Sequence, residues 1–161
     1  MEQQNAKRRL HLSNAPIDMN RVSLNKTPLD VSPLRVRQHR ILCVDDDVLG
    51  TTMRAEILKE HGYLVVVFHS PLEVTRCDLS IFNLAILDFE MPGLNGRELL
   101  LRMRALGARF PIVLLTGRLA TLPHEDRVLF SRCIDKDMPM HHLLDTIAKF
   151  LDPNQRPDYG S

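Results

Sequence analysis

Residues 83–96 read NLAILDFEMPGLNG and join a short apolar run to a turn. The run Leu84–Leu87 is uninterrupted and bounded by turn residues, which is typical of a strand buried on both faces of a parallel sheet. Asp88 follows the run directly, and open α/β sheets place ligands and chemistry at the carboxyl ends of their strands. The stretch therefore predicts a functional carboxylate at the end of a central strand.

Around this stretch, apolar runs alternate with amphipathic ones from residue 39 onward. The apolar runs predict strands at 41–44, 64–68, 84–87, 112–115 and 132–135. Helices are predicted to begin near Leu49, Ser70, Gly96, Pro123 and Met140. In the first of these, Leu49, Met53, Ile57 and Leu58 recur at helical spacing. Since parallel strands need crossover connections, the order predicts an α/β fold with a doubly wound, five-stranded parallel sheet.

Composition divides the chain into three parts. Residues 1–38 mix basic, polar and proline residues without a sustained period, which predicts a basic and mostly disordered leader. Residues 39–152 form the predicted domain, and residues 153–161 form a short tail. The formal net charge of +1 gives no global attraction to nucleic acid or to an anionic membrane.

Cysteine usage and hydropathy bear on the cell compartment. The 3 cysteines lack the spacing of zinc ligands or of a CxxC redox motif. No apolar run approaches the roughly 18 residues of a membrane span. We therefore expect a cytoplasmic protein with reduced thiols and no membrane segment.

Polar residues follow four of the five predicted strands. Asp45 and Asp46 follow the first strand, Asp88 the third, Thr116 the fourth and Lys136 the fifth. Right-handed crossovers bring all these strand ends to one edge of the sheet. Neighbouring carboxylates repel unless a cation joins them, and hard oxygen ligands suit Mg²⁺. The sequence thus predicts a metal-assisted site in which Asp88 attacks a phosphoryl group, with Thr116 and Lys136 as partners of its oxygens.

These residues resemble the receiver domain of two-component response regulators, a flavodoxin-like (βα)5 fold. The resemblance covers residues 40 to 151 and rests on the paired aspartates, the DxxMPxxxG turn at residues 88–96, Thr116 and Lys136. It implies phosphoryl transfer to Asp88 from a sensor histidine kinase or a phosphotransfer protein.

The resemblance also implies a role for each site residue. Asp46, Asp88 and the backbone carbonyl of Glu90 would hold Mg²⁺ or Mn²⁺, and Asp45 would support the metal through water. Thr116 would sense the phosphoryl group, and Lys136 would pair with it.

Four residues depart from the pattern of that family. Asp137 follows the lysine where the family usually has a cis proline, so the loop that aims Lys136 is a point to examine. Cys133 replaces the usual aromatic switch residue. Arg118 stands two residues after the threonine, where smaller or acidic residues are common. Glu90 stands at a position that influences how long the phosphoryl group survives in the family.

The expected function is that of a stand-alone signalling switch. It would catalyse only its own phosphorylation and autodephosphorylation, would not bind DNA directly, and would contact a downstream protein through the face of its fourth helix, fifth strand and fifth helix. One alternative is a degenerate receiver that binds partners without being phosphorylated. Another is a small aspartate-based phosphohydrolase, although the nucleophile of such enzymes follows the first strand and no late acidic pair is present here.

Overall fold

The computed structural model describes residues 39–152, which form one α/β unit. All five strands are parallel and lie in the order β2-β1-β3-β4-β5. Their bounds are β1 (Arg40–Val44), β2 (Leu64–Phe68), β3 (Leu84–Leu87), β4 (Ile112–Thr116) and β5 (Arg132–Asp135). The predicted fold class is confirmed, while the predictions for residues 1–38 and 153–161 lie outside the described residues.

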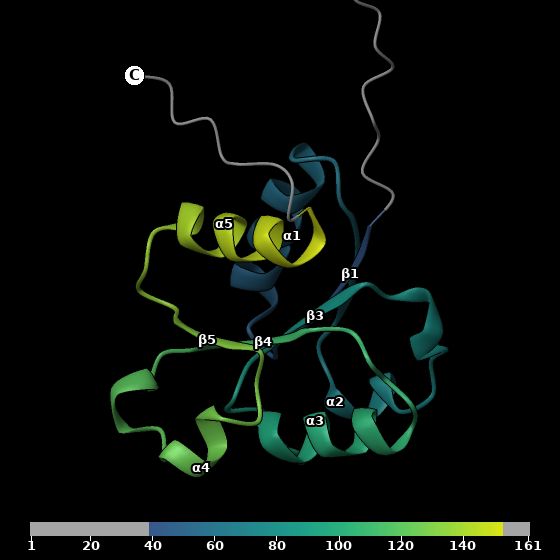
Figure 1. Cartoon of the computed structure of the whole chain (residues 1–161), viewed down its shortest axis with the longest axis vertical. Coiled ribbons are helices and arrows are strands. Elements are labelled where there is room, and N and C mark those ends of the chain that lie inside the picture. Colours follow the sequence, from purple (N-terminus) through teal and green to yellow (C-terminus); the bar gives the residue numbers. More distant parts are fainter. Residues whose placement is uncertain (1–38, 153–161) are drawn as a thin grey trace, which may run out of the picture. The chain divides into compact units, whose positions relative to one another are not determined.

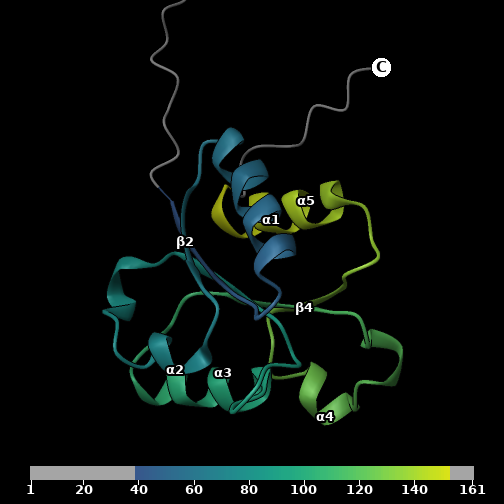
Figure 2. The ribbon, with the colours of Figure 1, turned by 180° about the vertical axis from the view of Figure 1, so that it is seen from behind.

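Helices cover both faces of the sheet. Figures 1 and 2 show α1 (Val48–Glu60) and α5 (Met140–Leu151) on one face, and α2 (Pro71–Val74), α3 (Gly96–Ala105) and α4 (His124–Arg127) on the other. Two short 3₁₀ helices, η2 (Leu79–Ile81) and η3 (Leu119–Thr121), lie in connecting segments. Within residues 39–152, no helix combines the length and the apolar character that crossing a bilayer requires.

The central strands supply both layers of the core because successive side chains point to opposite faces. In β1, Leu42 and Val44 join the cluster that includes Leu99 and Met103 of α3. Ile41 and Cys43 join the opposite cluster, which includes Leu58 of α1 and Leu143 and Ile147 of α5. Cys43 is 1% exposed, and its burial raises the pKa of its thiol to about 12.

The sheet-facing side of α1 differs from the one that the apolar spacing indicates. Leu49 and Met53 are 72% and 60% exposed, respectively. Of the four residues at that spacing only Leu58 is buried, and the other buried residues of the helix are Thr51 and Ala55. Asp47 caps the helix by accepting a hydrogen bond from the Gly50 amide at 3.1 Å, and this start fixes the register. The small side chains at positions 51 and 55 suit a close approach of the helix to the sheet.

The turn after β3 depends on Gly96. Its amide donates to the carbonyl oxygen of Phe89 at 2.9 Å. Asn95 caps α3 by accepting from the Glu98 amide at 2.9 Å, and the Glu98 carboxylate accepts from the Asn95 amide at 3.0 Å. A Cβ atom at position 96 would lie 2.4 Å from the carbonyl oxygen of Asp88. Only glycine therefore allows α3 to start directly against the backbone of Asp88.

Replacing Gly96 with alanine should lower the free energy of unfolding by about 1–3 kcal/mol, the usual cost of an overpacked site. Gly117→Ala is the matched control, since a Cβ atom there meets nothing within 4 Å, and its effect should stay within about 0.5 kcal/mol. Urea denaturation of both variants measures the difference. Equal losses would show that the close approach at Asp88 is not what requires glycine.

Candidate functional site

The sheet hydrogen bonds continue past the ends of the strands and hold the predicted site residues side by side. The Asp88 amide donates to the carbonyl oxygen of Val44 at 2.9 Å, and the Lys136 amide donates to that of Thr116 at 3.0 Å. Asp88 is thereby tied to β1, which precedes Asp45 and Asp46, and Lys136 is tied to β4, which ends at Thr116. Asp45, Asp46, Asp88, Thr116 and Lys136 all lie at this carboxyl edge of the sheet, as the sequence predicts.

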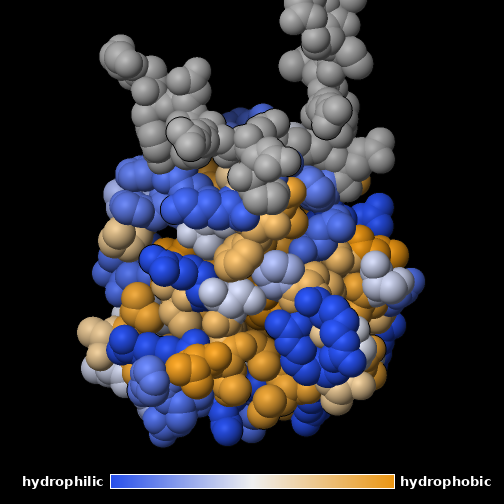
Figure 3. All heavy atoms as spheres, viewed as in Figure 1, coloured by the Kyte–Doolittle hydropathy of each residue, from blue (hydrophilic) through white to orange (hydrophobic). Residues whose placement is uncertain are grey.

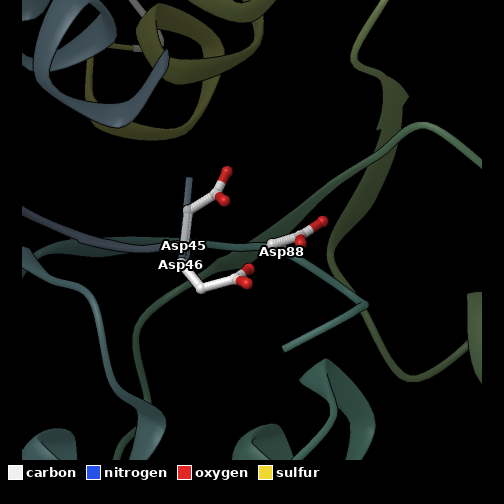
Figure 4. A group of neighbouring side chains, drawn as sticks. All are labelled: Asp45, Asp46 and Asp88. Carbon is white, nitrogen blue, oxygen red and sulfur yellow. The ribbon is translucent and has the colours of Figure 1, made fainter. Parts of the chain in front are cut away.

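Three carboxylates gather at this edge. Figure 4 shows Asp45 and Asp46, from the end of β1, beside Asp88, from the end of β3. Each offers an oxygen atom within 4.8 Å of the others. Asp45 and Asp88 are buried, at 2% and 6% exposed, whereas Asp46 is exposed. Two buried like charges so close to a third need neutralising partners.

Two cations approach the cluster. The Nζ atom of Lys136 lies 2.9 Å from Oδ2 of Asp45 and 3.1 Å from Oδ1 of Asp88. The Nη1 atom of Arg54, from α1, lies 3.4 Å from the same Oδ2 of Asp45. Sequence reasoning did not single out Arg54. Arg54 lies three residues after Thr51 and four before Leu58, so it shares the face of the helix that meets the sheet. This spacing is the signal that could have identified it.

Burial and charge shift the pKa values of the site in opposing ways. Burial raises the pKa of the Asp88 carboxyl above its ordinary value, although the ammonium of Lys136 opposes this. Burial also acts to lower the pKa of Lys136, but hydrogen bonds and charges from Asp45 and Asp88 outweigh it and raise that pKa. Lys136 is therefore a cation at neutral pH. The ionised carboxylate of Asp88 lowers the stability of the fold.

The oxygen atoms of the cluster fit a hard divalent cation. Both oxygens of Asp45 are engaged by the protein, since Oδ1 accepts from the Asp47 amide at 3.0 Å and Oδ2 meets the two cations. The individual roles expected of these residues, with Asp45 supporting a metal through water and Asp46 and Asp88 as direct ligands, stay predictions. The part expected of the Glu90 carbonyl stays a prediction.

Thr116 and the loop after it form the other side of the site. Thr116 is 1% exposed, and its hydroxyl oxygen accepts from the Arg118 amide at 3.2 Å. The guanidinium of Arg118 forms an ion pair with the Glu90 carboxylate. Two of the four departures from the family pattern are thus partners of each other. The influence of Glu90 on phosphoryl lifetime stays a prediction.

The loop that carries Lys136 is held without a proline. The Asp137 amide donates to Oδ1 of Asp135 at 3.0 Å, and the Met138 amide donates to the Asp135 carbonyl oxygen at 3.1 Å. Proline at position 137 has no amide hydrogen and would lack the first of these bonds. The carboxylate of Asp135 therefore supplies an alternative anchor for the loop, and Lys136 still reaches both buried aspartates.

Comparison with known families matches residues 41–148 to the response regulator receiver domain. The match covers more than half of the chain, so the protein belongs to this family of two-component signalling domains. Phosphorylation and Mg²⁺ binding are characteristic of the family. The resemblance drawn from the sequence is confirmed.

Individual relatives share part of their length with this chain. The chain is 33% identical to the transcriptional regulatory protein CpxR homolog of Haemophilus influenzae, over 73% of this chain and 52% of the relative. It is 31% identical to the sensor protein GacS of Pseudomonas syringae pv. syringae, over 64% of this chain and 12% of the relative. The chain thus spans about half, or much less, of the length of these curated relatives.

Solved structures give the same assignment. The response regulator protein TrrA from Thermotoga maritima, solved in complex with Mg²⁺-BeF, is similar with a TM-score of 0.65 and 28% identity, over 71% of this chain and 100% of that one. A CheY-like receiver domain protein from Methanospirillum hungatei gives a TM-score of 0.63 at 28% identity, over 72% and 95%. Both support the fold class of this chain.

Replacing Asp88 with asparagine should stabilise the metal-free protein at pH 7. Because the pKa of Asp88 is raised in the fold, its ionised form opposes folding above that pKa, and the penalty disappears as the pH falls to the value in the unfolded chain. The gain in the thermal midpoint, followed by circular dichroism, should therefore shrink on acidification. Saturating Mg²⁺ should raise the midpoint of the wild type but not of the variant.

Asp78→Asn is the matched control for this stability measurement. Hydrogen bonds from Ser80 hold the pKa of Asp78 below its ordinary value, so removing its charge should give no stabilisation at pH 7. An Asp88→Asn protein less stable than the wild type without metal would contradict the assignment of Asp88 as an unfavourably buried charge.

Proposed function

We propose that this protein is a phosphorylation-controlled switch that accepts a phosphoryl group on Asp88 in a Mg²⁺-dependent reaction. The observation that carries the proposal is the position of Lys136, whose ammonium bridges buried Asp45 and Asp88 at 2.9 and 3.1 Å. A cation so placed can follow negative charge that is added to Asp88. The donor is a sensor histidine kinase or a phosphotransfer protein of the cytoplasm.

In the proposed reaction, a carboxylate oxygen of Asp88 attacks the phosphorus atom of a phosphohistidine. A P–O bond forms as the P–N bond breaks, and the imidazole leaves with a proton taken from water. Mg²⁺, when bound, would offset charge on the carboxylates and the phosphoryl oxygens. Lys136 pairs with one phosphoryl oxygen, and the Thr116 hydroxyl donates to another. The protein's catalysis extends to this step and to hydrolysis of the acyl phosphate.

Two other functions compete with this proposal. A degenerate receiver would keep the fold but could not be phosphorylated. Here the residue types of a phosphorylated receiver are all present at the carboxyl edge of the sheet, namely Asp45, Asp46, Asp88, Thr116 and Lys136. A phosphohydrolase would use a nucleophile after the first strand, whereas Asp45 is here engaged through both oxygens by the Asp47 amide, Lys136 and Arg54. Both observations favour a phosphorylated receiver over these two alternatives.

Incubation with Mg²⁺ and acetyl phosphate should add one phosphoryl group to the wild type and none to Asp88→Asn, as measured by intact-mass spectrometry. Asp78→Asn is the control, because this exposed aspartate caps η2 and lies away from the carboxyl edge of the sheet. It should be phosphorylated to an extent within about twofold of the wild type. An unmodified wild type would support the degenerate receiver, and steady turnover of p-nitrophenyl phosphate would support the hydrolase.

Output is proposed to use the face of α4, β5 and α5, through contact with a downstream protein and without direct DNA binding. Figure 3 shows hydrophobic residues among charged ones at the surface near α4, and Val128, directly after this helix, is 61% exposed. A cavity of about 280 Å³ on this face is lined by Cys133 of β5 and by His142 and Thr146 of α5, among others. Such a surface is suited to a protein partner.

Arg127 links the loop that follows Thr116 to this face. Its Nε donates to the Leu122 carbonyl oxygen at 2.9 Å and its Nη2 to that of Ala120 at 3.2 Å and to that of Leu119. Its own carbonyl accepts from the thiol of Cys133 at 3.7 Å. A shift of Thr116 can therefore pass through the loop and Arg127 to β5, although no aromatic switch residue is present.

Loading the wild type with beryllofluoride should shift the amide NMR signals of residues 119–122 and 127–133. In Arg127→Met the shifts should persist in the loop and fall to about half or less beyond residue 127, because the hydrogen bonds to the loop carbonyls are lost. Arg132→Met, which removes an exposed arginine of β5, is the control and should retain the full pattern. Unchanged spectra beyond residue 122 in the loaded wild type would overturn this output face.

A further inference from the structure

Arg54 is a second cation on a carboxylate that already has one. Its side chain is 13% exposed, and its Nη1 lies 3.4 Å from Oδ2 of Asp45, whose side chain is 3% exposed. Lys136, in the loop after β5, approaches the same oxygen atom at 2.9 Å. An arginine is costly to bury unless it is paired. This pairing therefore needs an explanation beyond neutralising Asp45 alone.

The surroundings of Arg54 are apolar. With Lys136, it lines a cavity of about 240 Å³ between α1 and the sheet end, whose other walls include Leu115, Ile134 and Leu143. The side chains of Arg54 and Asp45 are only 13% and 3% exposed, so water screens their attraction less than it screens an ion pair at the surface. The guanidinium thus acts on the carboxylate at short range with little screening.

Lys136 contacts two carboxylates. It lies 3.1 Å from Asp88 as well as 2.9 Å from Asp45. A phosphoryl group on Asp88 would move the added negative charge outward from this carboxylate, and Lys136 would have to follow it. If Lys136 were the only cation on Asp45, its departure would leave a buried carboxylate unpaired, which is strongly unfavourable. Arg54 remains on the same Oδ2 atom whichever way the lysine turns.

We propose that Arg54 is a positioning residue for phosphoryl transfer, which holds Asp45 and so releases Lys136 to pair with the phosphoryl group. This inference rests on the function proposed above. It has two consequences of opposite sign. Without Arg54, the carboxylate cluster is more negative and binds a divalent cation more tightly. Without Arg54, Asp45 also retains Lys136 more strongly, and phosphorylation at saturating Mg²⁺ is slower.

The test compares Arg54→Met with Arg54→Lys and with Lys59→Met. Methionine has an unbranched chain that fits a cavity already lined by Met53, Met138 and Met140. Lys59→Met is the matched control, because it removes one positive charge from α1 at a site where the lysine pairs with exposed Glu56. The Kd of Mg²⁺ alone comes from calorimetry at low, constant ionic strength. The rate of phosphorylation by acetyl phosphate at saturating Mg²⁺ comes from intact mass.

Arg54→Met should bind Mg²⁺ about threefold or more tightly and take up the phosphoryl group about tenfold more slowly, as expected for the loss of one poorly screened charge. Arg54→Lys should return both values toward the wild type, and Lys59→Met should leave both within about twofold. If Arg54→Met fails to fold, Arg54→Gln, which keeps polar contacts but not the charge, should give the same two changes.

Weaker Mg²⁺ binding together with slower phosphorylation would overturn the inference, because a packing role would disturb Asp45 in that way. A phosphorylation rate equal to that of the wild type would also overturn it. Failure of the proposed function looks different, since the wild type itself would then take up no phosphoryl group and Arg54 would have no transfer step to assist.

Discussion

Repulsion between buried carboxylates at one edge of the sheet is the constraint on which the rest of the site depends. Parallel strands end together, so the chain cannot keep Asp45 and Asp88 apart once β1 and β3 are neighbours. The fold tolerates the two charges because Lys136 contacts both and Arg54 supports one of them. The order of the strands thus determines which cations the site needs and from which elements they come.

The sequence was informative where one local pattern settled one local structure. Four apolar residues before Asp88 could form only a short buried strand in this context, and the aspartates, threonine and lysine at successive strand ends had to meet. The buried face of α1 was not predictable in the same way. Its register follows from the cap at Asp47 and from the space over the sheet, so Thr51 and Ala55 are buried while Leu49 and Met53 face outward.

Arg54 escaped sequence reasoning for a related reason. A single arginine in an amphipathic helix reads as a solvated charge until the register shows which way it points. The departures from the family pattern were visible at once, but their compensations were not. Asp135 accepts from the Asp137 amide in place of the missing proline, and Arg118 pairs with Glu90. Such contacts join residues whose pairing no spacing rule specifies, and they become apparent only in three dimensions.

Gly96 and Asp88 lie in contact within one nine-residue turn but have opposite effects on the stability of the fold. Gly96 serves packing, since any larger residue would press on the Asp88 carbonyl. The side chain of Asp88 opposes folding, because burial raises its pKa. If Asp88 accepts a phosphoryl group as proposed, one nine-residue turn combines a glycine required for packing with an aspartate kept at the expense of stability.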